Sequence, residues 1–374
     1  MHPFSLFSAS KAPEKWLYDA ICRKKQLFPT SRSGFLILHE CLQLEQMPRY
    51  PLLCGFTPLQ RMENLEQALG CGPLYIKRDD LTPLGLGGNK TRKLEFLLGD
   101  ALAGGADTLV TVGGVQTNHG RLTAAAAAKA GLACTLVLDG AQPEKLSGNL
   151  LLDCLLGASL VYTDGRSTSA VIEETLAALQ AAGRAPYFIP EGGSNAVGSA
   201  GYLAMVPELL AQAGSLPVPP ARLVCTMGSL GTFAGLWLGA RAFGAPFSVT
   251  GVAVNPTTGY TREKAAALVN EMSAAYGLDI AAAPEDMDII YADAAHDYAG
   301  SGYNVPDAKT RGAVELLART EGIFLDPCYT AKSFRGFCDI ARELDGGAIF
   351  VHTGGTPALW TQEHLDAFAA DYWN

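Results

Sequence analysis

The feature that most constrains the fold of this chain is a regular alternation of helical and strand patterns that begins near residue 92. Residues 92–105, RKLEFLLGDALAGG, place leucines on one helical face, and residues 107–114, DTLVTVGG, read as a short buried strand that ends in glycines. The same cycle recurs up to residue 193. Strands separated by helices of this length are typical of βαβ units, so the sequence predicts a parallel, twisted sheet.

A second series of the same kind follows the proline-rich stretch SLPVPPARL at 215–223 and ends with AIFVHTGG at 348–355. A chain of 374 residues is too long for one compact core, so we expect an α/β protein of two domains, each a mostly parallel sheet flanked by helices. Ligands bind such sheets at the carboxyl ends of the strands. Glycine turns stand at four of these ends, VGGVQTNHGR, PEGGSN, TMGSLGT and HTGGTP, which predicts one deep site between the domains.

Composition excludes several classes of protein. A formal net charge of -9 argues against a nucleic-acid surface, and no apolar run approaches the roughly 20 residues that span a bilayer. Nine scattered cysteines without a C-x-x-C pair are typical of reduced thiols in the cytoplasm. No Cys/His pair has ligand spacing, so we expect no metal. Basic residues among the first 33 positions leave an organelle transit peptide as an alternative.

The stretch GLGGNKTR at 85–92 looks like a phosphate-binding P-loop, but its spacing fails. A P-loop with Lys90 would need glycines where Asn89 and Leu84 stand. A lysine at the start of a helix, and buried, is instead driven toward its neutral amine, the form that attacks an aldehyde to make a Schiff base. The alternative is a surface lysine in a first helical turn.

A second motif, TMGSLGTFAGL, joins an apolar strand to an apolar helix. It holds two hydroxyls and several free N–H groups at a helix start, an arrangement suited to a phosphate monoester, in Gly228, Ser229, Gly231 and Thr232. The same residues could equally form a tight turn with a capping Ser or Thr.

A third motif, GGVQTNHGR, places four polar residues before an alanine-rich helix: Gln116, Thr117, Asn118 and His119. Capping by Thr117 or Asn118 needs only one such residue, so four in a row favour a ligand surface. Tyr303 and Tyr329 lie in irregular segments, where an aromatic residue is less often part of a core. Finally, Thr353 precedes two glycines, where a ligand or backbone can approach closely.

Together these motifs resemble the D-cysteine desulfhydrase / 1-aminocyclopropane-1-carboxylate (ACC) deaminase family of pyridoxal-phosphate (PLP) enzymes, which have fold type II and are similar to tryptophan synthase β. The resemblance runs from GFTPLQRMENL at 55–65 to HTGGTPALW at 352–360 and includes RDDLTPLGLGGNKTRKLEFLL. It implies a larger PLP-binding domain from residues 51–91 and 202–374, a smaller inserted domain at 92–201, and PLP in the cleft between them. Residues 1–50 form an N-terminal arm outside the resemblance.

The resemblance also implies roles for the cofactor-binding residues. Lys90 would form the Schiff base with PLP and move the α-proton, and Asn118 would hydrogen-bond the ring hydroxyl. The phosphate would be held by Gly228, Ser229, Gly231 and Thr232. Thr330, with Thr353 nearby, would face the pyridine nitrogen.

On the substrate side, the resemblance implies that Thr117, with Gln116 and His119, faces the substrate carboxylate. Tyr303 and Tyr329 would line the substrate pocket, so that Lys90, Thr117 and the two tyrosines form the catalytic set. Two departures stand out: the family usually has Ser in place of Thr117 and a small residue in place of Leu230. The extra methyl group of Thr117 restricts its χ1 rotamers and would reduce the space in the adjoining pocket.

Thr330 discriminates within the family, since ACC deaminases resemble one another in carrying glutamate there. A hydroxyl does not fix a proton on the pyridine nitrogen as a carboxylate does, which favours β-elimination over opening of a cyclopropane ring. The resemblance therefore implies a homodimeric lyase that converts D-cysteine to pyruvate, ammonia and hydrogen sulfide. The alternatives are ACC deamination, desulfonation of cysteate, or a non-catalytic PLP or amino-acid binding protein.

Overall fold

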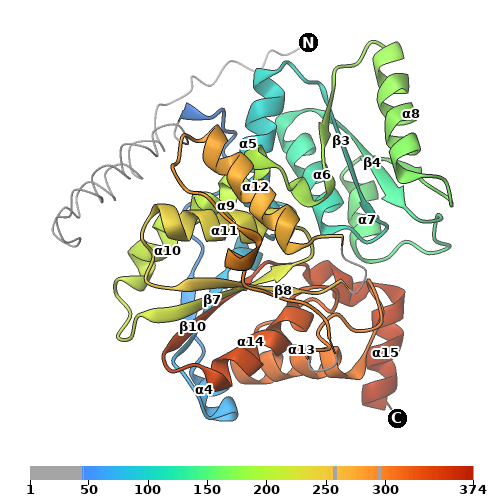
Figure 1. The fold of residues 1–374 in the computed structure, drawn as a ribbon. Coiled ribbons are helices and arrows are strands. Elements are labelled where there is room, and N and C mark those ends of the chain that lie inside the picture. The colour runs from blue at the N-terminus through green and yellow to red at the C-terminus, as the bar shows by residue number, and fades with distance from the viewer. Residues whose placement is uncertain (1–43, 45, 256–258, 294–295, 374) are drawn as a thin grey trace, which may run out of the picture.

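The computed structural model describes residues 44, 46–255, 259–293 and 296–373, in which the strands form two separate sheets (Figure 1). The larger sheet has the strand order β1 (Leu59–Arg61), β2 (Leu74–Arg78), β10 (Gly347–His352), β7 (Pro220–Met227), β8 (Ser248–Ala253), β9 (Ile289–Ile290). The smaller sheet has the order β5 (Ser159–Tyr162), β4 (Ala133–Asp139), β3 (Thr108–Gly114), β6 (Pro186–Ile189). Only β1 and β2 pair antiparallel among these strands. The predicted α/β class with two mostly parallel sheets is confirmed.

Helices cover both faces of the larger sheet (Figure 1). One face carries α9 (Ala196–Leu203), α10 (Met205–Ala213), α11 (Gly231–Ala242) and α12 (Arg262–Ala275). The other carries α4 (Glu63–Leu69), α13 (Ala308–Glu321), α14 (Thr330–Glu343) and α15 (Gln362–Trp373). Successive strand residues point to opposite faces, so Leu223 and Cys225 of β7 enter the core beneath α11 while Val224 enters the core beneath α14.

The smaller sheet is flanked by α5 (Lys90–Ala103), α6 (Asn118–Ala130), α7 (Gly148–Leu155) and α8 (Thr168–Ala181). The helix predicted from residue 92 begins at Lys90, and the alanine-rich helix predicted to follow His119 begins at Asn118. Lys90 and Asn118, two candidate cofactor-binding residues, are therefore each the first residue of a helix. Short 3-10 turns complete the fold: η1 (Asp79–Leu81), η2 (Glu191–Gly193), η3 (Pro284–Asp286) and η4 (Thr356–Trp360).

A buried ionic cluster fixes the first turn of α5 to the segments around the larger sheet. Arg92 donates to Asp79 (Nε to Oδ2, 2.8 Å) and to Glu208 (Nη1 to Oε2, 2.9 Å), and the Tyr202 hydroxyl also donates to Asp79. Burial alone would raise the pKa of Asp79, but Arg92 outweighs it and holds that pKa below its ordinary value. Lys90, two residues away, is thus carried on a firmly anchored turn.

The strands divide cleanly along the chain. Those of the smaller sheet fall between residues 108 and 189, and those of the larger sheet fall within 59–78 and 220–352. The exact domain boundaries at 91/92 and 201/202 stay predictions. The predicted N-terminal arm lies outside the described residues, apart from its last few positions.

Candidate active site

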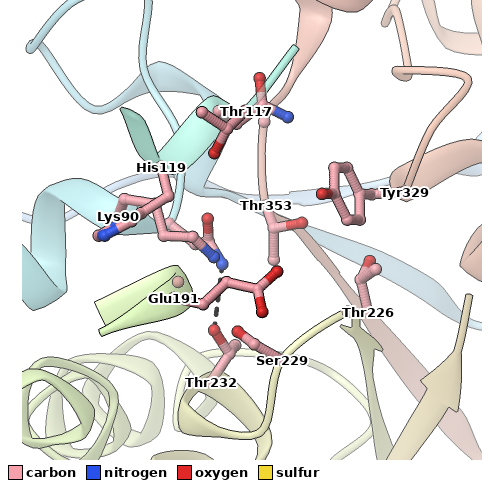
Figure 2. A pocket seen from close by; sticks show the side chains of 14 residues that line it. Lys90, Thr117, His119, Glu191, Thr226, Ser229, Thr232, Tyr329 and Thr353 are labelled. Carbon is pink, nitrogen blue, oxygen red and sulfur yellow. Dashed lines mark hydrogen bonds between the residues drawn. The ribbon is translucent and has the colours of Figure 1, made fainter. Parts of the chain in front are cut away.

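A pocket opens where β3, β6, β7 and β10 end, so both sheets contribute to it (Figure 2). It brings together residues from all four glycine turns that the sequence singled out and from the Lys90 stretch. The lining residues are Asn89, Lys90, Thr117, Asn118, His119, Glu191, Gly192, Thr226, Gly228, Ser229, Thr232, Tyr329, Thr353 and Gly354.

Lys90 is the first residue of α5 and lines this pocket. Burial lowers the pKa of its amine from 10.5 to about 8, and the carboxylate of Glu191 opposes that shift. Among the described residues, the amine has no hydrogen-bond partner. At neutral pH a lysine in this state has a larger neutral fraction than an exposed lysine, and the neutral amine is able to act as a nucleophile or base.

The glycine turn before Lys90 is held in place by hydrogen bonds to its backbone, and at Gly87 it leaves no space for a side chain. Gly87 has φ +74°, and a Cβ there would lie 1.9 Å from the Asp80 carbonyl oxygen. The Asn89 N–H donates to the carbonyl of Thr353 at 3.0 Å, and Arg121 of α6 donates to the carbonyl of Gly87 at 3.0 Å. The turn is therefore tied to both sheets.

The polar turn at the start of α6 combines capping with pocket lining. Thr117 is the N-cap, and its hydroxyl accepts a bond from the Gly120 N–H at 3.2 Å while the residue lines the pocket. His119 also lines the pocket and pairs through Nε2 with the Thr111 hydroxyl at 2.8 Å. Burial, and then the nearby Lys90, lowers the pKa of His119 well below its ordinary value, so its imidazole is neutral.

Gln116 belongs to the same turn, but its side chain forms hydrogen bonds with residues 147 and 149 at the start of α7. Its Oε1 accepts from the N–H of Asn149 at 2.9 Å, and its Nε2 donates to the carbonyl of Ser147 at 3.1 Å. Gln116 is not among the residues that line the pocket. The structure thus places the side-chain amide of Gln116 against the start of α7.

In the turn from β7 to α11, the residue at the N-cap supplies no capping side chain. Leu230 occupies the N-cap position, and the N–H of Gly231 donates to Ser194 Oγ at 3.1 Å. Leu230 is buried. Ser229 and Thr232 line the pocket together with Glu191 (Figure 2). The partial positive charge of an uncapped helix start favours an anion here.

The two predicted tyrosines meet edge-on, with ring centroids 5.8 Å apart. A Cβ at Gly228 would lie 2.8 Å from the Tyr329 ring, and a Cβ at Gly114 would lie 3.0 Å from the Tyr303 ring. Tyr329 lines the pocket, whereas Tyr303 lies beside it over the end of β3 and is 37% exposed. Burial raises the pKa of Tyr329, so its hydroxyl stays protonated.

Two predicted threonines occupy different positions. Thr353, at the end of β10, lines the pocket. Thr330 starts α14 and is not a lining residue; its hydroxyl donates to Asp326 Oδ1 at 2.6 Å. Asp326 also accepts from the N–H groups of Cys328, Tyr329 and Thr330, so this carboxylate organises the first turn of α14.

Several lining residues were not singled out from the sequence. Glu191 is the only acid among them, and Tyr260 Oη donates to its Oε2 at 2.6 Å. The glycine turn PEGGSN pointed to this place, and an acid at a strand end could have been noted. Asn89 donates to the Thr232 hydroxyl at 3.0 Å (Figure 2), and Thr226 bonds Ser333, contacts that local sequence does not reveal.

Other kinds of site were searched for in the same part of the chain. No group of three or more His, Cys, Asp or Glu side chains able to hold a metal ion occurs in the described residues. Within those residues, every helix is too short or too polar to cross a bilayer.

Comparison with known proteins yields a family match and close relatives. A family model described as pyridoxal-phosphate dependent enzyme matches residues 51–354. The chain is 40% identical over 328 residues to a D-cysteine desulfhydrase of Yersinia enterocolitica, covering 85% of this chain and 97% of that protein. It is 39% identical over 322 residues to a Pyrococcus abyssi protein provisionally named 1-aminocyclopropane-1-carboxylate deaminase, covering 85% and 94%. A crystal structure of an ACC deaminase homologue has a TM-score of 0.79 at 35% identity, covering 91% of this chain and 99% of that one.

Proposed function

The chain belongs to the pyridoxal-phosphate dependent enzyme family, and we propose that it is a lyase that eliminates hydrogen sulfide from D-cysteine. The observation that carries the proposal is the pairing, in one pocket, of a lysine amine without a partner among the described residues and an uncapped helix start. The substrate assignment is supported by the 40% identity to a D-cysteine desulfhydrase over most of both chains.

The pocket residues fit the cofactor. Lys90, with its lowered pKa, would attach covalently to the aldehyde, and the α11 start with Ser229 and Thr232 would hold the phosphate. Gly228 and Gly231 would let the backbone of this turn approach the phosphate, and the packing requires glycine at 231, because a Cβ there would lie 2.7 Å from Lys93 Nζ. Asn118 would donate to the ring oxygen. When bound, the cofactor supplies an electron sink for the electrons released at the substrate's α-carbon.

The residues of the chain would carry out the remaining steps. Lys90, once displaced by the substrate amine, would take the α-proton, and its pKa of about 8 suits a base that works near neutral pH. Thr117 and the neutral His119 would face the substrate carboxylate, with Gln116 holding their turn in place. Tyr329 and Tyr303 would bound the β-substituent side. Overall, D-cysteine and water give pyruvate, ammonia and hydrogen sulfide.

Position 330 favours this elimination over ACC deamination. Threonine at this position carries no carboxylate that could face the ring nitrogen, and its hydroxyl is already bonded to Asp326. Thr353 is the hydroxyl that lines the pocket at the adjacent strand end. Without a fixed ring proton the electron sink is weaker, and loss of a good leaving group demands less of it than ring opening does.

The experiment that tests the function is a substrate panel on the purified, PLP-loaded protein. We expect D-cysteine to give sulfide and pyruvate faster than ACC gives α-ketobutyrate or cysteate gives sulfite, and Lys90→Ala to abolish the activity. A faster reaction with ACC or cysteate would move the protein to one of the alternatives. PLP binding without turnover of any of these compounds would make it a binding protein.

We also propose a cytoplasmic homodimer. The cysteines of the described residues are all free, as expected for a reducing compartment. The element η4 packs against both α7 and α15. These three elements carry large apolar side chains that are exposed: Leu151, Leu155, Trp360 and Leu365. A second copy of the chain would cover this surface, and sedimentation analysis of the wild type and Leu155→Glu would detect the association.

A further inference from the structure

Asn149, at the start of α7, contacts the proposed cofactor residue Asn118. The side chain of Asn149 is fully buried, and its Nδ2 lies 2.9 Å from Asn118 Oδ1. The same Nδ2 lies 2.8 Å from the backbone carbonyl of Gln116. None of the motifs read from the sequence included Asn149.

These two contacts decide which way both amides point. The carbonyl of Gln116 can only accept, so the atom of Asn149 that faces it must be the NH2 group. That same NH2 group faces Asn118, so the Asn118 atom opposite it must be the oxygen. The NH2 group of Asn118 is therefore turned away from Asn149.

The backbone keeps Asn149 in this place. Its N–H donates to Gln116 Oε1, and Gln116 Nε2 donates back to the carbonyl of Ser147. Gly148 has φ +54°, and a Cβ there would lie 2.6 Å from Gln116 Oε1. The turn at 147–149 and the turn at 116–118 are thus joined by reciprocal bonds that leave little freedom.

The NH2 group of Asn118 is left as a donor. It makes no hydrogen bond to the described residues, and it lies 2.9 Å from the position a Cβ would take on Gly355. Asn118 also lines the pocket. An oxygen in its place would face the ring oxygen of the cofactor acceptor to acceptor, which is repulsive.

We propose that Asn149 is a positioning residue that fixes the amide of Asn118 so that its NH2 group, and not its oxygen, is presented to the cofactor's ring oxygen. Asn149 acts through Asn118 and does not touch the cofactor. The inference rests on the proposed role of Asn118 and is independent of which amino acid is the substrate.

The test compares Asn149→Leu, Asn118→Ala and the double variant for PLP affinity and for the pH midpoint of the bound cofactor's absorbance. A donor facing the ring oxygen stabilises its deprotonated form, so loss of orientation raises that midpoint. For Asn149→Leu we expect about tenfold weaker PLP binding and a midpoint about one pH unit higher. In the Asn118→Ala background, Asn149→Leu should change neither quantity further.

Asn270→Leu is the matched control. Asn270 also holds a loop by two bonds of its amide, to the N–H and carbonyl of Ala282, but lies outside the pocket. It should alter unfolding stability without moving the cofactor's absorbance. Asn149→Ala replaces the leucine variant if that protein does not fold.

Several outcomes would overturn the inference. Unchanged affinity and midpoint in the Asn149 variant would remove any link to the cofactor. An equal effect with and without Asn118 would show that Asn149 acts by packing alone. If Asn118→Ala itself changed nothing, the role proposed for Asn118 would fail as well, whereas D-cysteine turnover would still decide the proposed function.

Discussion

The helices α6 and α11 both begin where a parallel strand ends at the pocket, yet their first turns are built differently. At α6, Thr117 caps its own helix by accepting from the Gly120 N–H. At α11, Leu230 stands at the N-cap without a capping side chain, and Ser194, from another segment, accepts from the Gly231 N–H.

The two turns differ in the residue that caps the helix: α6 is capped by its own Thr117, whereas Leu230 supplies no cap to α11, which suits the phosphate site that we propose there. A capped start has already used part of its positive end, so α6 is suited to present side chains such as Asn118. At α11 the N-cap residue supplies no acceptor, so the helix dipole and the first-turn N–H groups other than that of Gly231 stay available for an anion. The pattern of polar residues alone did not distinguish the two turns, because both contain a Ser or Thr within a glycine-containing stretch between a strand and a helix.

The largest expected effect comes from placing a negative charge at the uncapped start. Ser229→Asp should weaken PLP binding at least about 100-fold through repulsion of the phosphate, while the unfolding free energy of the apo-protein stays the same or rises by about 0.5 kcal/mol. Absorbance titration with PLP and denaturant unfolding measure the two quantities. Ser229→Ala, which adds no charge, should lose only a few-fold; a similar loss in both variants would contradict the anion site.

An intermediate effect is expected at the capped start. Thr117→Ala should lower the unfolding free energy by about 1 kcal/mol, because the Gly120 N–H loses its acceptor, and Thr117→Ser should restore it. Affinity for PLP should change little in either variant, and denaturant unfolding combined with PLP titration checks both points. If Thr117→Ala weakened PLP binding as strongly as Ser229→Asp, the proposed difference between a capping turn at α6 and an anion-binding turn at α11 would be contradicted.

The smallest expected effect concerns the pKa of Lys90, which the nearby carboxylate of Glu191 influences. Glu191 is a nearby carboxylate that favours the ammonium form, so Glu191→Gln should lower the pKa of Lys90 from about 8 by about half a pH unit. Covalent attachment of PLP to the apo-protein should then reach half its maximal rate at a lower pH. Tyr260→Phe, which keeps the charge, is the control; a midpoint that rose in Glu191→Gln would refute this sign.

The sequence predicted the periodic parts of the molecule because periodicity is local. The strand and helix patterns around 107–114 and 221–231 indicated two parallel sheets, and glycine turns indicated where a ligand would lie. Side-chain directions depend on contacts between distant segments, so the sequence alone could not predict them. Thr330 turns to Asp326, and Gln116 turns to α7, because the neighbours that receive them are set by the fold.

Asn149 is the clearest example of what a motif search misses. It lies at the start of α7, outside the motifs that the sequence singled out, and its partner Asn118 is 31 positions away. Strand order is a further case: β10 lies between β2 and β7, a position that no local pattern encodes.

That position of β10 has a consequence for how the protein is made. The strand fills the middle of the larger sheet, and the carbonyl that follows it accepts from the Asn89 N–H beside Lys90. While a ribosome synthesises the chain, β2 and β7 therefore emerge long before the strand that joins them, and the Lys90 turn lacks one of its supports. We therefore expect the chain to take up the cofactor only after β10 has been translated, and a chain truncated before β10 to bind PLP poorly.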